Sequence, residues 1–158
     1  MGLTIRKLDR TDREAASSAL RASGAFTEEE VSIALGVFDD ATAESASGYA
    51  AFAAEEGGSF LGYVCGGSTP LTESTWHVYW ICVHPRAQSR GVGRALTERF
   101  EASVRSQGGR RIVVETSGRP DYSRARHFYE AAGYRQVGRI PDFYRRGDDA
   151  VVYFKELA

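Results

Sequence analysis

The sequence predicts an α/β (α+β mixed) domain, in which a central mixed sheet of about seven strands packs against about four helices. Three observations favour this class. The chain has 158 residues, of which 42% are hydrophobic and 26% charged, as in one globular domain with a sizeable core. Hydrophobic periods of roughly 2 and roughly 3.6 residues alternate along it. Glycine-rich turns separate these segments in the order β-α-α-β-β-β-α-β-α-β-β.

The N-terminal half reads as one strand, two helices and three further strands. Residues 3–8 alternate between apolar and polar side chains, which predicts a strand. Residues 13–23 have a helical pattern, and a second helix begins after Thr27, an N-cap whose capping box Glu30 completes. Glycine pairs and a proline bound the next predicted strands, at residues 48–55, 59–66 and 75–83.

An amphipathic helix is predicted over residues 91–106. Four apolar side chains recur there at intervals of four on one face: Val92, Leu96, Phe100 and Val104. Glu101 and Arg105 lie one helical turn apart on another face.

Four elements follow up to the end of the sequence. Residues 110–116 are short and apolar enough for a central strand. A helix over residues 122–132 is expected to end at Gly133, which suits a left-handed cap. Two last strands are predicted at residues 134–140 and 150–156.

Composition narrows the classes of partner and compartment. Residues 84–126 hold 10 Arg against 4 Asp or Glu, but the chain has a pI near 6.3 and no nucleic-acid-binding motif, so no nucleic acid is expected. No apolar run approaches the roughly 20 residues of a membrane span, so no membrane partner is expected. Cys65 and Cys82 fall in strand-like runs, as buried thiols of a cytoplasmic protein would. The histidines and cysteines lack the spacing of metal ligands, so no metal is expected.

The segment QSRGVG, residues 88–93, lies between a predicted strand and a predicted helix. Backbone N–H groups at a helix start have no partner within the helix, and glycines let anionic oxygens approach them. Arg94 followed by Ala95 does not fit a Walker loop, and Leu96 is too bulky for the third glycine of a Rossmann fingerprint. The pattern Gln-x-x-Gly-x-Gly is matched in full.

Two segments resemble the GNAT superfamily of acyl-CoA-dependent N-acyltransferases. VHPRAQSRGVGRAL, residues 83–96, resembles the signature loop of that family. ARHFYEAAGY, residues 125–134, resembles the helix and following strand of its second motif. The resemblance covers nearly the whole chain, so residues 1–158 are expected to form a single GNAT acetyltransferase domain, with acetyl-CoA (coenzyme A) as cosubstrate.

The resemblance implies the residues that bind coenzyme A. The pyrophosphate is expected on the loop, and the pantetheine arm beside the preceding strand. At the second helix, Tyr122 replaces a usual asparagine, so Ser123 or Arg126 is expected to substitute for it, and Arg124 is within reach of a phosphate. The resulting set is Cys82, Val83, Gln88, Ser89, Arg90, Gly91, Val92, Gly93, Arg94, Ser123, Arg126 and Tyr129.

The resemblance also implies catalytic roles. Tyr129 aligns with a tyrosine that protonates the departing thiolate, which a phenol can do because it is neutral at pH 7. The identity of the general base stays open. His77 stands where many relatives have a carboxylate, and Glu115 ends the neighbouring central strand. Tyr79 is a third candidate. In a regular strand residues 77, 79 and 81 share one face, a parity that a bulge would break.

The acceptor is expected to be the amine of a small molecule or a peptide. In the family it is held by the N-terminal helices and by the loop between the last strands, which are here residues 25–30 and 142–149. Those regions contain carboxylates and aromatic rings that attract a cation. The candidates are Glu28, Tyr79, Phe143, Tyr144 and Asp148. Relatives are often homodimers, and no interface stands out here.

The prediction is an N-acetyltransferase that transfers an acetyl group from acetyl-CoA to a primary amine by direct attack in a ternary complex. The alternative is a non-catalytic acyl-CoA-binding or regulatory domain. A dinucleotide-binding oxidoreductase is the third reading.

Overall fold

A seven-stranded mixed sheet organises the molecule, of which the computed structural model describes residues 2–158. The strand order is β1-β2-β3-β4-β5-β7-β6, and all neighbours are antiparallel except β4 and β5. The strands are Leu3–Lys7 (β1), Tyr49–Glu56 (β2), Ser59–Ser68 (β3), Thr75–Val83 (β4), Arg111–Ser117 (β5), Arg135–Arg145 (β6) and Asp148–Glu156 (β7). This confirms the predicted fold class and element order.

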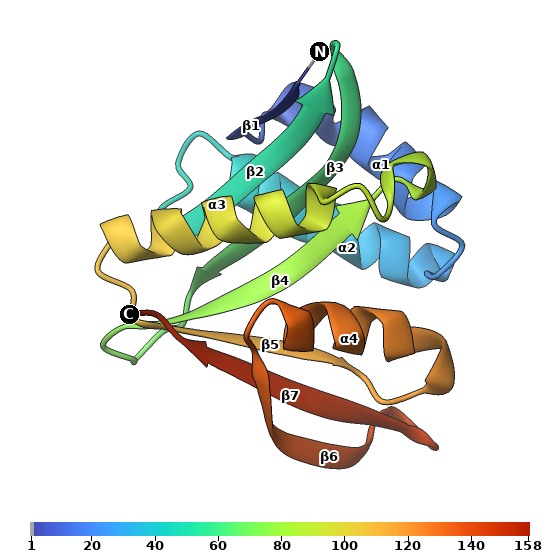
Figure 1. Cartoon of the computed structure of the whole chain (residues 1–158), viewed down its shortest axis with the longest axis vertical. Helices are drawn as coiled ribbons and strands as arrows, with labels where there is room; N and C mark the ends of the chain where they lie inside the picture. The colour runs from blue at the N-terminus through green and yellow to red at the C-terminus, as the bar shows by residue number, and fades with distance from the viewer. Residues whose placement is uncertain (1) are drawn as a thin grey trace.

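Helices cover both faces of the sheet (Figure 1). Helices α1 (Arg13–Ala22) and α2 (Glu28–Thr42) pack on one face, while α3 (Val92–Ser106) and α4 (Ser123–Ala131) pack on the other. Three short 3-10 turns precede α1, α3 and α4, at Arg10–Asp12, Pro85–Ala87 and Pro120–Tyr122.

Local signals in the sequence determine several helix ends. The Thr27 hydroxyl accepts a hydrogen bond from the Glu30 amide over 3.1 Å, and the Glu30 carboxylate accepts one from the Thr27 amide over 3.1 Å. This is the predicted capping box. Gly133 follows α4 with φ of 92°, the predicted left-handed conformation.

Each face of the sheet has its own hydrophobic core. The predicted stripe on α3 is buried against β2–β5 and β7, and Tyr129 of α4 joins it. The second core lies between α1, α2 and the opposite face of β2–β4. Cys65 and Cys82 are buried free thiols in this second core, as expected.

A bulge in β4 changes the predicted parity of that strand. Val78 pairs with Gly66, and Trp80 pairs with Cys65, which leaves Tyr79 as the extra residue. Before the bulge, Val78 packs in the α3 core; after it, the odd-numbered Ile81 does so instead. Residues 77 and 81 therefore do not share a face, which corrects the regular alternation.

The C-terminal hairpin is tighter than the sequence suggests. β6 continues to Arg145 and β7 begins at Asp148, so the turn between them contains only residues 146–147. Between the pairs Ile140–Ala150 and Arg145–Asp148, the register of β6 shifts. The expected loop over residues 142–149 is thus an irregular segment of paired strand.

The parallel pair β4 and β5 separates along its length. The register runs through Thr75–Arg111 and Trp76–Ile112 and ends at His77–Val113. β4 nevertheless continues to Val83 and β5 to Ser117. The backbone of β4 beyond His77 therefore has no strand partner on its β5 side. This gap in strand pairing, the β4–β5 opening, extends from His77 to the end of β4.

Candidate active site

Residues 88–93, between β4 and α3, form a turn whose backbone geometry suits an anion, the candidate anion-binding turn. Ser89 has φ of 63° and Gly91, the N-cap of α3, has φ of 82°. Because glycine has no side chain to cap the helix, the first amides of α3 remain available to a ligand. Gln88 steadies the turn, since its Nε2 donates to the Val83 carbonyl over 3.3 Å.

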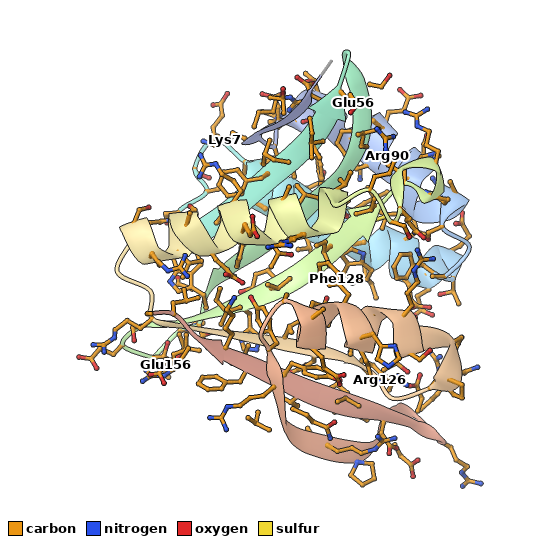
Figure 2. The ribbon with its side chains drawn as sticks, viewed as in Figure 1. Lys7, Glu56, Arg90, Arg126, Phe128 and Glu156 are labelled. Atoms are coloured by element: carbon orange, nitrogen blue, oxygen red, sulfur yellow. The ribbon has the colours of Figure 1, made fainter. Side chains whose placement is uncertain are left out.

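Two of the arginines around this turn already have carboxylate partners. Arg90 forms a 2.7 Å ion pair with Glu56 at the end of β2 (Figure 2). Arg94 pairs with Glu98 over 2.8 Å on the exposed side of α3. The Arg90–Glu56 pair links the turn to β2, and both pairs leave less positive charge for a ligand than the sequence suggests.

A cation from α4 also lies at the turn. Arg124 of α4 donates to the Ser89 hydroxyl over 2.8 Å, so its guanidinium lies at the turn. Arg126, which was in the predicted set, instead donates to the carbonyls of Ser117 and Arg119, over 2.8 Å each. Its guanidinium is tied to the end of β5. Ser123 is the first residue of α4.

Helices α3 and α4 approach each other at the predicted motif residues. A Cβ on Gly93 would lie 3.0 Å from Cε1 of Phe128, so only glycine fits there without movement. Figure 2 shows Phe128 on the side of α4 that faces α3. Val92, by contrast, is a buried core residue, 2% exposed, so its side chain cannot contact a ligand.

Residues at the end of β4 line the opening through their backbone. Val83 packs against the α3 core, while Cys82 points into the α1–α2 core and is 5% exposed. Burial raises the pKa of the Cys82 thiol to about 12. The thiol therefore stays protonated at neutral pH, which argues against a cysteine nucleophile.

Tyr129 lies on α4 among three other aromatic rings. Its ring centroid is 5.5 Å from that of Phe128, 6.0 Å from Tyr134 and 5.9 Å from Tyr153. Burial, followed by the neighbouring Tyr144, raises its pKa above the ordinary value for tyrosine. The phenol is therefore neutral at neutral pH and has a proton to donate.

His77 and Glu115 lie together where β4 and β5 begin to separate. His77 Nε2 is 3.9 Å from Oε1 of Glu115. On its other side, His77 Nδ1 is hydrogen-bonded to the Thr69 hydroxyl over 2.9 Å. The Tyr79 ring lies nearly parallel to the imidazole, with centroids 6.3 Å apart. The structure thus brings all three predicted base candidates together.

The predicted acceptor residues divide into two groups. Burial, followed by the carboxylates of Glu115 and Asp148, raises the pKa of Tyr144 to about 12, so both carboxylates act on this phenol. Phe143 packs edge-on against Tyr144, with centroids 5.0 Å apart. Glu28, in contrast, pairs with Arg21 over 3.1 Å on the surface of α1 and α2. It is not part of the cluster.

Asp148 is less available than the sequence suggests. It is 4% exposed, accepts a hydrogen bond from the Ser117 hydroxyl, and lies 3.5 Å from the Arg145 guanidinium. Its charge is therefore largely neutralised within the hairpin. Glu115 is the more open carboxylate of the two, with a side chain that is 40% exposed.

The prediction missed a contact between the two sides of the site. The Tyr122 hydroxyl donates to the Ala25 carbonyl over 3.4 Å, which joins the start of α4 to the α1–α2 connection. Phe26 packs against Trp80 of β4, with centroids 5.4 Å apart. Both tyrosine and tryptophan were visible in the sequence, but no local pattern places them opposite residues of the α1–α2 connection.

Metal-binding clusters and membrane-spanning helices were both sought in residues 2–158. Nowhere in this described part do three or more His, Cys, Asp or Glu side chains gather as a metal would require. None of the helices in it is both long and apolar enough to cross a membrane.

Comparison with known proteins adds a family model and several relatives. Residues 13–134 match the model described as the acetyltransferase (GNAT) family. A crystal structure of a GNAT-family protein from Desulfovibrio desulfuricans is 37% identical, with a TM-score of 0.93, covering 99% of this chain and 100% of that one.

Two further proteins match over a shorter segment or at lower sequence identity. The mycothiol acetyltransferase of Beutenbergia cavernae is 39% identical over 64 residues, which is 40% of this chain and 21% of that protein's length. The yncA protein of Salmonella typhimurium, solved with acetyl-CoA, has a TM-score of 0.79 at 20% identity, covering 100% of this chain and 95% of that one. At that identity the likeness shows the fold alone.

Proposed function

Because the chain belongs to the GNAT acetyltransferase family, we propose that it transfers an acetyl group from acetyl-CoA to a primary amine by direct attack in a ternary complex. The single observation that carries this proposal is the opening between β4 and β5. The candidate anion-binding turn follows β4 beyond this gap, and Tyr129 of α4 packs in the core on the α3 side of the sheet.

The turn suits the diphosphate of coenzyme A. Uncapped amides at the start of α3 and the guanidinium of Arg124 offer hydrogen bonds to anionic oxygens. The unpaired edge of β4 from Val78 to Val83 offers amide and carbonyl groups to the pantetheine arm, as an added strand would take them. When bound, acetyl-CoA supplies the activated acetyl group.

The transfer needs one proton removed and one supplied. The amine nitrogen attacks the thioester carbonyl carbon, the carbon–sulfur bond breaks, and an amide and a thiol result. Tyr129 donates a proton to the departing sulfur, and solvent restores it before the next cycle. His77 and Glu115 are the groups positioned to take the proton that the amine loses.

The residues around the opening favour a cationic acceptor. The open carboxylate of Glu115 and the rings of Tyr79 and Tyr144 attract an ammonium group. A lysine-like amine, with a pKa near 10.4, is less than about 0.1% neutral at pH 7 and needs a base; an α-amine near 7.8 needs less help. The acceptor is a small molecule or a peptide. We place the reaction in the cytoplasm, since the two free thiols suit a reducing compartment.

A combined binding and turnover screen tests the proposal. Thermal shift is measured with acetyl-CoA, coenzyme A and NAD(P), and thiol release from acetyl-CoA is followed with amino acids, polyamines, aminoglycosides and peptides. We expect stabilisation by acetyl-CoA and thiol release with at least one amine. Stabilisation without thiol release across the panel would favour the non-catalytic acyl-CoA-binding domain. Stabilisation by NAD(P) alone would favour the oxidoreductase.

A further inference from the structure

Thr69 is the first partner of the His77 imidazole. It follows β3 in the connection to β4, and its hydroxyl lies 2.9 Å from Nδ1 of His77. The connection is rigid at this point, because the Thr69 amide donates to the Thr75 carbonyl over 2.8 Å and the Thr69 carbonyl accepts from the Thr72 hydroxyl over 2.7 Å. The hydroxyl is therefore held at the ring.

The other ring nitrogen faces a carboxylate. Nε2 of His77 lies 3.9 Å from Oε1 of Glu115, two residues beyond the last β4–β5 pair. A nitrogen lone pair that faces a carboxylate oxygen is repelled by it, whereas an N–H is attracted. A neutral imidazole that faces Glu115 therefore carries its proton on Nε2. Nδ1 then has a free lone pair, which the Thr69 hydroxyl satisfies by donating to it.

The groups near His77 and Glu115 do not compete for these proton positions. Tyr79 stacks on the imidazole, Tyr49 packs against Tyr79 with centroids 6.3 Å apart, and Tyr144 lies near Glu115. Within residues 2–158, no arginine or lysine nitrogen lies within 4.0 Å of the Glu115 carboxylate. The imidazole is thus the nearest nitrogen base to Glu115.

Resting on the proposed function, we propose that Thr69 is a positioning residue that holds His77 in its Nε2–H tautomer, so that Glu115, rather than His77, receives the proton of the acceptor amine. Both nitrogens of the imidazole are engaged, one by Thr69 and one toward Glu115. The Glu115 side chain is 40% exposed, so its second carboxylate oxygen is the proposed proton acceptor. The proton passes from the amine nitrogen to that oxygen as the carbon–nitrogen bond forms.

The tautomer can be measured without any acceptor. Imidazole ¹⁵N NMR at a pH above the titration of the ring distinguishes protonated from unprotonated nitrogens. We expect a protonated Nε2 in wild type, the same in Thr69→Ser, which keeps the hydroxyl, and a mixture of tautomers in Thr69→Val. A wild-type ring protonated on Nδ1, or a Thr69→Val spectrum identical to wild type, would overturn the assignment of Thr69.

Kinetics then separate the roles of His77 and Glu115. At neutral pH and with a lysine-like amine, Glu115→Gln is expected to lower kcat by about 100-fold or more, as loss of a general base does. His77→Gln and Thr69→Val keep the carboxylate, so each is expected to lose about tenfold, and Thr69→Ser close to nothing. With an α-amine acceptor, whose pKa near 7.8 leaves a large neutral fraction at pH 8, the loss in Glu115→Gln is expected to be much smaller.

A larger loss in His77→Gln than in Glu115→Gln would make His77 the base and refute the proposal. Failure of the proposed function is distinguishable from this result. In that case wild type releases no thiol with any amine, while the ¹⁵N spectra still report whether Thr69 controls the tautomer.

Discussion

The Tyr134 phenol donates a 3.0 Å hydrogen bond to Oε2 of Glu101, and both side chains are buried beneath α3. Nζ of Lys155 lies 3.0 Å from Oε1 of the same carboxylate. A buried charge needs such partners, because the free-energy cost of desolvating it is several kcal/mol. The contact joins the helix that begins at the candidate anion-binding turn to the segment that follows α4.

Two buried tyrosines therefore respond differently to removal of their hydroxyl groups. Tyr134→Phe is expected to lower the free energy of unfolding by about 2 kcal/mol, since it removes a hydrogen bond to a charged group. Tyr63 is 0% exposed and its phenol oxygen has no hydrogen-bond partner within residues 2–158. Tyr63→Phe is expected to leave that free energy unchanged or raise it by up to about 1 kcal/mol. Urea denaturation measures both, and equal destabilisation would contradict the contrast.

Alkaline pH is expected to destabilise the fold. Burial is the first cause that raises the pKa values of Tyr63, Tyr129 and Tyr134 above their ordinary value. The folded state disfavours their phenolates, whereas an unfolded tyrosine ionises near pH 10. Their contribution to stability is thus complete below pH 10 and is lost as the pH rises above it. Tm should fall steeply between about pH 10 and 12, and less steeply in Tyr63→Phe; a constant Tm would refute this.

Replacing the N-cap glycine of α3 tests the candidate anion-binding turn. Gly91 has φ of 82°, so Gly91→Ala is expected to cost about 1 to 2 kcal/mol of stability. The first amides of α3 also shift, and the affinity for coenzyme A is expected to fall about tenfold, the equivalent of one charge-assisted hydrogen bond.

Gly36→Ala is the matched control for that substitution. Gly36 lies within α2, exposed, and an added Cβ would meet nothing within 4 Å. It is expected to stabilise the protein by about 0.5 to 1 kcal/mol and leave coenzyme A affinity unchanged. Calorimetric titration compares the two variants. If both bind coenzyme A as wild type does, the diphosphate does not bind at this turn.

The two thiols are expected to be unreactive in the folded protein. Burial raises the pKa values of Cys65 and Cys82 to about 12 each. A disulfide thiol reagent at pH 8 should label neither residue until denaturant is added, after which both react. Rapid labelling of native protein would contradict the burial of Cys82. Thiols that do not react in the native protein also add no background signal to an assay of coenzyme A release with the same reagent.

Local rules predicted the parts of the structure that depend on near neighbours in sequence. The Thr27 capping box, the buried stripe of α3 and the left-handed Gly133 all follow from residues within one or two helical turns. The loop at residues 88–93 also lies where its glycines and the preceding proline predicted, at the start of a helix.

Features that depend on distant strands were not predictable in this way. The bulge at Tyr79 requires Gly66 on the neighbouring strand, where a Cβ would collide with the His77 carbonyl oxygen. The glycine pair at residues 66–67 was interpreted as a turn, although a glycine inside a strand is also a bulge signal.

The partner of Glu101 illustrates the same limit. Arg105, one turn away, lies 4.0 Å from the carboxylate, but Glu101 is 4% exposed and its closer partner is Lys155, 54 residues later. Helical spacing describes a solvent-exposed face and carries no information about which strand covers it. Thr69 was missed for the same reason, because its role depends on the fold of the hairpin that precedes His77.

The kinetics of Tyr129→Phe test whether Tyr129 protonates the departing thiolate. This substitution removes one hydroxyl and keeps the aromatic packing with Phe128, Tyr134 and Tyr153. Single-turnover acetyl transfer and calorimetric binding of coenzyme A are measured on wild type and variant. We expect a rate of transfer at least about 100-fold lower with unchanged affinity for coenzyme A. A variant that transfers acetyl groups at the wild-type rate would contradict this role of Tyr129.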